Sequence, residues 1–234
     1  TALDTPEAKA LAAKRPDFIK AALKDQDASI VGVGLRAAVL TGYPGIEEEL
    51  DRHLSSPNAE ERLAVADALA QAGAGPLEAK VRARVLLEKD SRVHVALIAA
   101  LSKSDDPSTA KILRQVLEKT DDDLRNDFWN ATVDSEKPWL RALVVELAQR
   151  EGPHRSAAID RLVERGFDAD GVKICAEIFE KTPLKGEPNH AQYYVLQEHC
   201  MDGLSKLAGR RVERAESLKY AHEWLAQNQR QKAQ

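Results

Sequence analysis

The two cysteines, Cys175 and Cys200, are the residues whose chemistry the sequence constrains most. Neither belongs to a C-x-x-C pair, so the sequence contains no zinc-ribbon or thioredoxin motif. They lie on the two arms of an expected helical hairpin, 169–181 and 190–207, and the point midway between them falls in the joining loop. Because residues equidistant from the turn of an antiparallel hairpin face each other, a disulfide fits this spacing, and it would indicate an oxidising compartment. Two reduced cysteines buried as small apolar side chains are the alternative.

The other ionisable residues do not form a recognisable catalytic or metal-binding pattern. His190, His199 and Cys200 are not spaced to place metal ligands on one helical face. The acidic runs at 105–106 and 121–123 lie in loops that lead into expected helices, where carboxylates interact favourably with the helix dipole. No glycine-rich phosphate loop and no serine-centred nucleophile elbow occurs. We therefore expect no enzymatic activity, no cofactor and no metal site.

Trp129 and Trp139 gather with Phe128 in a chain that is only 5% aromatic. Tryptophan is enriched at the energetic centres of protein interfaces, so these rings are candidates for partner contact. They could equally fill a wide gap between helices, where alanines would leave a cavity. The sequence leaves both interpretations open, and core packing is the favoured one.

The elements that position these residues are expected to be helices throughout. The chain has 234 residues, 43% of them hydrophobic, and few aromatic residues, a composition that favours helices over β-sandwiches and barrels. The formal net charge is −4, whereas proteins that bind nucleic acid usually carry an excess of basic residues. No apolar run approaches the roughly 18 residues that a membrane span requires. We therefore expect that the protein does not bind nucleic acid and does not span a membrane.

Apolar residues recur at helical spacing along the whole chain, for example at Leu140, Leu143, Val144 and Leu147. Acids or amides stand at expected helix starts, and glycines stand just after expected helix ends. These signals predict helices over 6–14, 16–24, 28–41, 45–55, 59–72, 76–88, 91–103, 107–119, 122–132, 138–150, 153–165, 169–181, 190–207 and 213–228. Short connections between them favour antiparallel neighbours.

A repeat of 31 or 32 residues underlies this pattern. Similar blocks begin at Asp27, Asn58, Asp90 and Asp121, each with a capping residue followed by small and apolar residues at fixed offsets. A more ordinary amphipathic helix lies between successive blocks. Helix pairs that repeat at this period are typical of an α-solenoid, in which each pair buries its apolar face only by stacking on its neighbours.

The blocks resemble HEAT repeats, specifically the short HEAT-like type also called PBS-lyase-like. In that family the second helix of each pair opens with an acid, an apolar residue and an arginine, and it ends in a small-apolar pattern. Arg62 matches the family's arginine and Arg125 matches it in the fourth block, whereas Val31 and His94 depart from it. The resemblance covers about residues 20–165 and implies a scaffold that binds a macromolecule along a concave surface.

We therefore predict an all-α fold: a right-handed α-solenoid forming one domain, 1–234. Residues 1–26 would form N-terminal capping helices, 27–166 the HEAT-like repeats, and 167–234 a helical hairpin with a final capping helix. The chain begins at Thr1 rather than Met. We take this start to indicate removal of a leader or origin in a longer chain, and with the candidate disulfide it favours an exported or periplasmic protein.

The predicted function is non-enzymatic binding of a protein partner on the concave helix face. The candidate contact residues are Arg62, Arg92, His94, Arg125 and Trp129. Related helical repeats imply two enzyme-type alternatives, a bilin-lyase-like or a DNA-glycosylase-like module, and a third alternative is an architectural domain of a larger chain. The sequence does not assign the identity of the partner or the oligomeric state.

Overall fold

The computed structural model describes residues 16–25, 27–41, 43–119, 122–132, 134–181 and 190–232. All regular structure in these ranges is helical, which confirms the predicted all-α fold. The helices are α2 (Pro16–Ala22), α3 (Ala28–Thr41), α4 (Ile46–Leu54), α5 (Ala59–Ala72), η1 (Gly75–Leu77, a 3-10 helix), α6 (Glu78–Val85), α7 (Ser91–Leu101), α8 (Thr109–Lys119), α9 (Asp122–Ala131), α10 (Pro138–Gln149), α11 (Arg155–Arg165), α12 (Ala169–Glu180), α13 (His190–Ala208) and α14 (Arg214–Lys232). Their ends lie within about one turn of the predicted ends, and the helix expected at 6–14 lies outside the described residues.

Predicted capping residues begin several of these helices. The Asn58 side chain accepts a hydrogen bond of 3.0 Å from the Glu60 backbone N–H, and Asp90 accepts one of 3.0 Å from the Arg92 backbone N–H. Such bonds satisfy donors that have no acceptor inside the first helical turn. Gly73 ends α5 with a φ of 89°, a conformation that glycine adopts without strain. The cap predicted at Asp121 lies outside the described residues.

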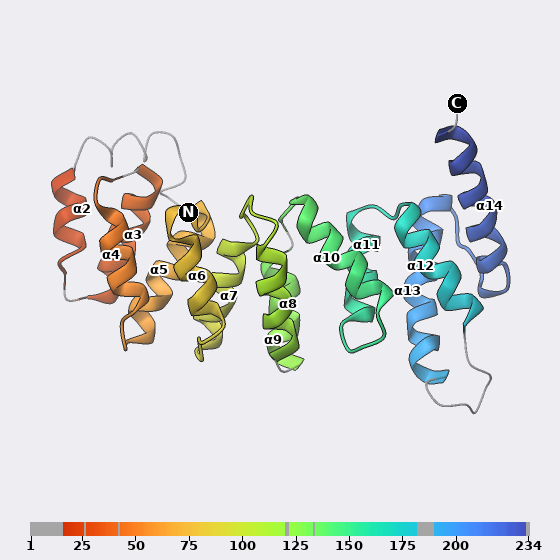
Figure 1. The fold of residues 1–234 in the computed structure, drawn as a ribbon, viewed down its shortest axis with the longest axis horizontal. Coiled ribbons are helices and arrows are strands. Elements are labelled where there is room, and N and C mark those ends of the chain that lie inside the picture. The colour runs from red at the N-terminus through yellow and green to blue at the C-terminus, as the bar shows by residue number, and fades with distance from the viewer. Residues whose placement is uncertain are drawn as a thin grey trace. The chain divides into compact units, whose positions relative to one another are not determined.

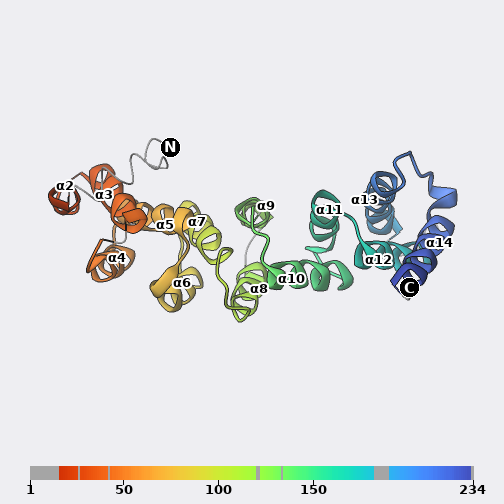
Figure 2. The same ribbon diagram turned by 90° about the horizontal axis from the view of Figure 1, so that it is seen from above.

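The described residues pack as two units, one ending at Leu140 and the other beginning at Arg141, so that the boundary falls within α10. In the first unit, α3, α5, α7 and α9 lie side by side in one layer, and α4, α6 and α8 lie along one side of it (Figures 1 and 2). The core between the layers contains Leu35, Leu69, Leu97 and Leu101.

Contacts between residues about 32 positions apart bind successive helix pairs of the first unit together. Arg92 pairs with Glu60 at 2.8 Å, and the Lys103 ammonium donates to the Gln71 carbonyl at 2.8 Å, each across 32 residues. Ser135 donates to the Ser102 carbonyl 33 residues earlier. The sequence period therefore corresponds to equivalent positions on adjacent helices.

Small residues allow the first helices to approach closely. A Cβ added to Gly34 of α3 would lie 2.8 Å from the Ala22 Cβ and 3.2 Å from the Leu23 backbone nitrogen. A Cβ on Gly32 would lie 3.0 Å from the Ala64 Cβ of α5. Glycine is required at position 34 because the neighbouring backbone of α2 occupies the space of a side chain.

In the second unit, α11 packs along α13, and α12 packs against both α13 and α14. The ring of Phe167 fills the gap beside Gly171 and Gly203, where an added Cβ on either glycine would lie within 2.8 Å of the ring. Ile159, Leu162 and several residues of α12 complete this second core. No described helix of either unit is long and apolar enough to cross a membrane.

Candidate functional site

Arg62 of α5 is buried and uses its guanidinium within the chain. Its Nε and Nη2 atoms each donate to one carboxylate oxygen of Glu88 at 2.9 Å, and Nη1 donates to the carbonyls of Ser56 and Pro57 at 3.0 Å. Arg84 also donates to Glu88 at 3.0 Å. Burial opposes ionisation of Glu88, but the two arginines and nearby backbone N–H groups lower its pKa to about 2. This geometry makes Arg62 a structural residue, and its contact with a partner stays a prediction.

His94 occupies the position of Arg62 on the next helix of the layer, α7, and is 7% exposed. Its Nδ1 atom is buried and has no hydrogen-bond partner among the described residues. Desolvation lowers the pKa of His94, opposed in part by the Val85 carbonyl and by Glu88. Its position inside the first unit, where it is covered by protein, therefore favours the neutral form of the side chain.

Arg92, by contrast, is exposed at the start of α7. It forms ion pairs with Glu60 at 2.8 Å and with Asp90 at 3.0 Å, and its side chain is 54% exposed. Both carboxylates raise its pKa, Asp90 more strongly. A partner carboxylate could compete for this guanidinium, because an exposed ion pair is worth little and exchanges readily with solvent.

Trp129 of α9 is buried at 8% exposure, and its ring meets that of Phe128 edge to face, with centroids 5.3 Å apart. Trp139 is also buried and donates from Nε1 to the Ser104 carbonyl at 2.8 Å. These positions agree with the core interpretation of the tryptophans. The side chain of Arg125 lies outside the described residues.

Helices α3, α5 and α7 are the second helices of the predicted repeats, which the resemblance implies line the partner-binding surface, and they carry several partly exposed residues. Each helix buries some of its positions in the core and leaves others partly or fully exposed. We call this surface the α3–α5–α7 face, and its apolar members are Ile30, Val33, Leu63, Ala70, Val95 and Ala99. Arg36 and Asp67 lie among them; burial raises the pKa of Asp67, and Arg36 opposes that shift.

A hollow of about 380 Å³ lies at one end of the first unit. Its walls come from the turn between α3 and α4 and from the segment after α5, and they include Tyr43, Glu47, Leu50 and Leu69. None of the five predicted contact residues lines it.

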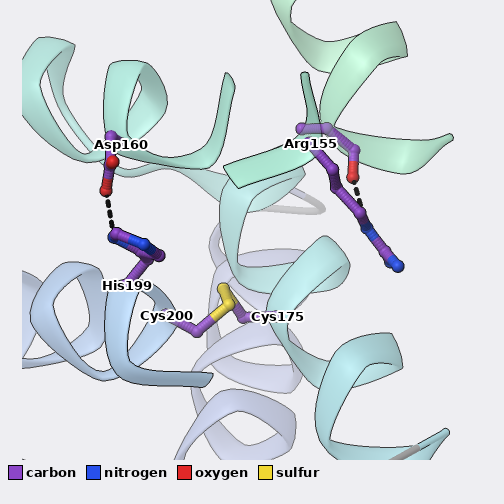
Figure 3. Close-up of a disulfide and its surroundings, with 6 residues drawn as sticks. Arg155, Asp160, Cys175, His199 and Cys200 are labelled. Atoms are coloured by element: carbon purple, nitrogen blue, oxygen red, sulfur yellow. Dashed lines mark hydrogen bonds and ion pairs between the residues drawn. A yellow bond between two sulfur atoms is a disulfide. The ribbon is translucent and has the colours of Figure 1, made fainter. Parts of the chain in front are cut away.

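In the second unit, Cys175 of α12 and Cys200 of α13 form a disulfide (Figure 3). Their Cα atoms are 5.4 Å apart, within the usual range for this bond, and both side chains are fully buried. The prediction from their equal distance to the hairpin loop is confirmed. The bond ties together the two arms that flank residues 182–189.

Beside the disulfide, α11 and α13 bring together a serine, a histidine and an aspartate. The Ser156 Oγ lies 2.8 Å from the His199 Nε2, and the His199 Nδ1 pairs with the Asp160 carboxylate. Figure 3 shows His199 pointing from α13 toward Asp160, next to Cys200. Asp160 raises the pKa of His199 above its usual value, and burial opposes that shift.

Sequence reasoning missed this group because it searched for a nucleophile elbow and for metal-ligand spacing. One signal was present: Ser156 and Asp160 are four residues apart, so they share a face of α11. Their pairing with a histidine 43 residues from Ser156 depends on how α11 and α13 pack. Among the described residues, no group of three histidine, cysteine or acidic side chains could hold a metal ion.

Comparison with protein-family models, with curated proteins and with solved structures finds no match.

Proposed function

We propose that the first unit is a HEAT-like helical stack that binds a protein partner on its α3–α5–α7 face. One observation carries this proposal: α3, α5 and α7 pack successively against one another, and each of them leaves apolar side chains partly exposed. Exposed apolar side chains on adjacent helices, with charged residues beside them, are typical of an interaction site.

The chemistry of the face indicates the kind of segment that it would accept. Ile30, Val33, Leu63 and Val95 offer aliphatic contacts, while Ala70 and Ala99 are small and partly exposed. An amphipathic helix that lays its apolar side along such a surface is a common mode of recognition. Arg36 and Asp67 would select charged groups of the partner, and Arg92 lies nearby at the start of α7.

Site-specific crosslinking tests this proposal. A photoreactive amino acid replaces Leu63 in the full chain, and in a control it replaces Leu87, which is 71% exposed in the turn after α6. Irradiation in the native source should give one defined protein adduct from position 63 and none from position 87. Adducts at neither position, or the same adducts at both, would overturn the assignment of this face.

Charge reversal tests the residues predicted from the sequence. Arg92→Glu combined with Arg125→Glu should weaken capture of the crosslinked partner while the helical content stays unchanged. An unchanged yield of the adduct in the folded double variant would remove both arginines from the contact surface.

We further propose that the protein works in an oxidising compartment. The buried disulfide between Cys175 and Cys200 supports this location, because glutathione and thioredoxin keep cysteines reduced in the cytosol. Alkylation of the protein from its native source, without reductant, should leave its mass unchanged. Two alkylated cysteines in that material would contradict the location.

A further inference from the structure

Ser156, His199 and Asp160 are connected in the order that nucleophilic catalysis by serine requires. The hydroxyl oxygen of Ser156 lies 2.8 Å from Nε2 of the imidazole, and the aspartate pairs with the opposite nitrogen, Nδ1. Such a triad is recognised by its geometry and by the role of each member, and it occurs on unrelated folds in different chain orders.

We propose that Ser156, His199 and Asp160 form a hydrolytic site for carboxylic acyl esters in the second unit. In the neutral imidazole the proton resides on Nδ1, which donates a hydrogen bond to the Asp160 carboxylate, so that Nε2 is free to accept the proton of the Ser156 hydroxyl. The aspartate thereby holds the tautomer and the ring orientation that a general base needs.

The reaction proceeds in two balanced steps. The Ser156 Oγ forms a bond to the ester carbonyl carbon as its proton passes to His199 Nε2; the alcohol then leaves with that proton, and an acyl-serine remains. Water next attacks the acyl carbon and gives a proton to Nε2; the bond to Oγ breaks, the proton returns to Ser156, and a carboxylic acid is released. Water is the only co-reactant.

The backbone around Ser156 suits the charge that develops on the substrate. Ser156 is the second residue of α11, which begins at Arg155 and has 11 residues. N–H groups in the first turn of a helix have no acceptor within the helix, and the helix dipole adds positive potential there. The Arg155 N–H already donates to the Gly152 carbonyl at 3.3 Å, so it is the N–H groups of Ser156 and Ala157 that could donate to the carbonyl oxygen as it becomes an oxyanion.

The surrounding fold holds the three side chains in register. Ser156 and Asp160 are one turn apart on α11, and α13 packs along α11 in the same unit. Cys200, next to His199, is bonded to Cys175 of α12, which restrains this part of α13. Ser156 is partly exposed, and the side chains of His199 and Asp160 are 26% and 47% exposed, so an ester can reach the group from solvent.

The charges around His199 are acidic on both helices. Asp160 faces it from α11, and Glu198 and Asp202 on α13 add smaller contributions that also raise its pKa. The imidazole is therefore protonated at acidic pH, where it cannot accept the serine proton. Hydrolysis should rise with pH through a midpoint above 6.5, the usual value for histidine.

Labelling with a fluorophosphonate, which reacts with activated serines, tests the proposal on the full oxidised chain. Peptide mass analysis should place the adduct on Ser156, and p-nitrophenyl acetate should be hydrolysed with formation of an acyl-serine. Ser156→Ala should abolish both signals. Ser91→Ala removes an exposed first-turn serine of α7 and should change neither.

Variants of the partners separate catalysis from helix packing. His199→Gln retains a hydrogen-bonding side chain but no general base, so the labelling rate should fall by about a hundredfold or more. Asp160→Asn should lower the rate and move its pH midpoint downward, because the carboxylate raises the pKa of His199. Circular dichroism checks that each variant is folded. No adduct on Ser156 in the folded wild-type protein, or equal labelling in folded His199→Gln, would overturn the proposal and leave the group as a polar contact between α11 and α13.

Discussion

The guanidinium of Arg62 holds both carboxylate oxygens of Glu88 at 2.9 Å, across 26 residues of sequence. The Glu88 side chain is fully buried, and that of Arg62 is 9% exposed. The pair joins the start of α5 to the segment before α7, which are adjacent elements of the first unit. A residue that the sequence assigned to a partner surface thus connects one helix pair to the next.

Removing the charge of Glu88 should destabilise the first unit. The pKa of about 2 in the folded state, against 4.5 for a free glutamate, corresponds to roughly 3 kcal/mol. Glu88→Gln leaves Arg62 buried without its counter-ion and should lower the free energy of unfolding by about 3 kcal/mol in urea titrations at pH 7. Glu118→Gln, on an exposed position of α8, should change it by less than about 0.5 kcal/mol.

The same pair predicts an acid-sensitive contribution to stability. Because folding lowers the pKa of Glu88, its contribution is complete above about 4.5 and is lost as the pH falls toward about 2. Wild-type protein should therefore lose stability in this window more steeply than Glu88→Gln. Parallel acid profiles of the two proteins would contradict the assignment of the lowered pKa to Glu88.

His94 should also make stability fall with decreasing pH, but in a window nearer to neutral pH than that of Glu88. Burial lowers the pKa of His94 below 6.5, so the imidazole binds a proton more tightly in the unfolded chain than in the folded protein. The folded state is therefore disfavoured as the pH falls below 6.5. His94→Leu removes the unpaired Nδ1 and should abolish this loss of stability at low pH. Urea unfolding of the variant and of wild type at pH 8 and pH 5.5 measures the difference. His222→Leu, at an exposed position of α14, is the control and should not flatten the profile in the same way.

A side chain at position 34 should push α2 and α3 apart. Gly34→Ala places a Cβ 2.8 Å from that of Ala22, and overpacking of this kind costs about 1–3 kcal/mol. Ala22→Gly in the same chain removes the opposing Cβ, so the double variant should recover part of the loss. A double-mutant cycle measures this coupling, and strictly additive effects would show that the two helices do not meet at these residues.

Reduction of the disulfide should weaken the second unit. The bond closes a loop across 25 residues, for which chain entropy gives about 3.5 kcal/mol. Urea unfolding followed with and without reductant should show this difference, and the reduced protein should regain its stability on reoxidation. Equal unfolding midpoints in the two states would mean that the bond adds nothing to folding.

Local patterns in the sequence were sufficient for the helices and their spacing. Caps such as Asn58 and Asp90 act within one helical turn. The apolar periodicity of a helix indicates which of its sides is buried, without reference to the neighbouring helices. The disulfide was also accessible, since the two cysteines are placed symmetrically about the loop of a helical hairpin. These features depend on short distances along the chain or on the symmetry of one turn.

Only the tertiary structure decided which polar residues are covered and which meet. Arg62 and His94 lie on helices whose period was predicted, yet their burial depends on the segments before α5 and α7 that close over them. Ser156 meets His199 because α11 and α13 pack in one particular register, and a shift of one residue would rotate either side chain away by about 100°. Registers between helices arise from the packing of many side chains together, so no local pattern in the sequence records them.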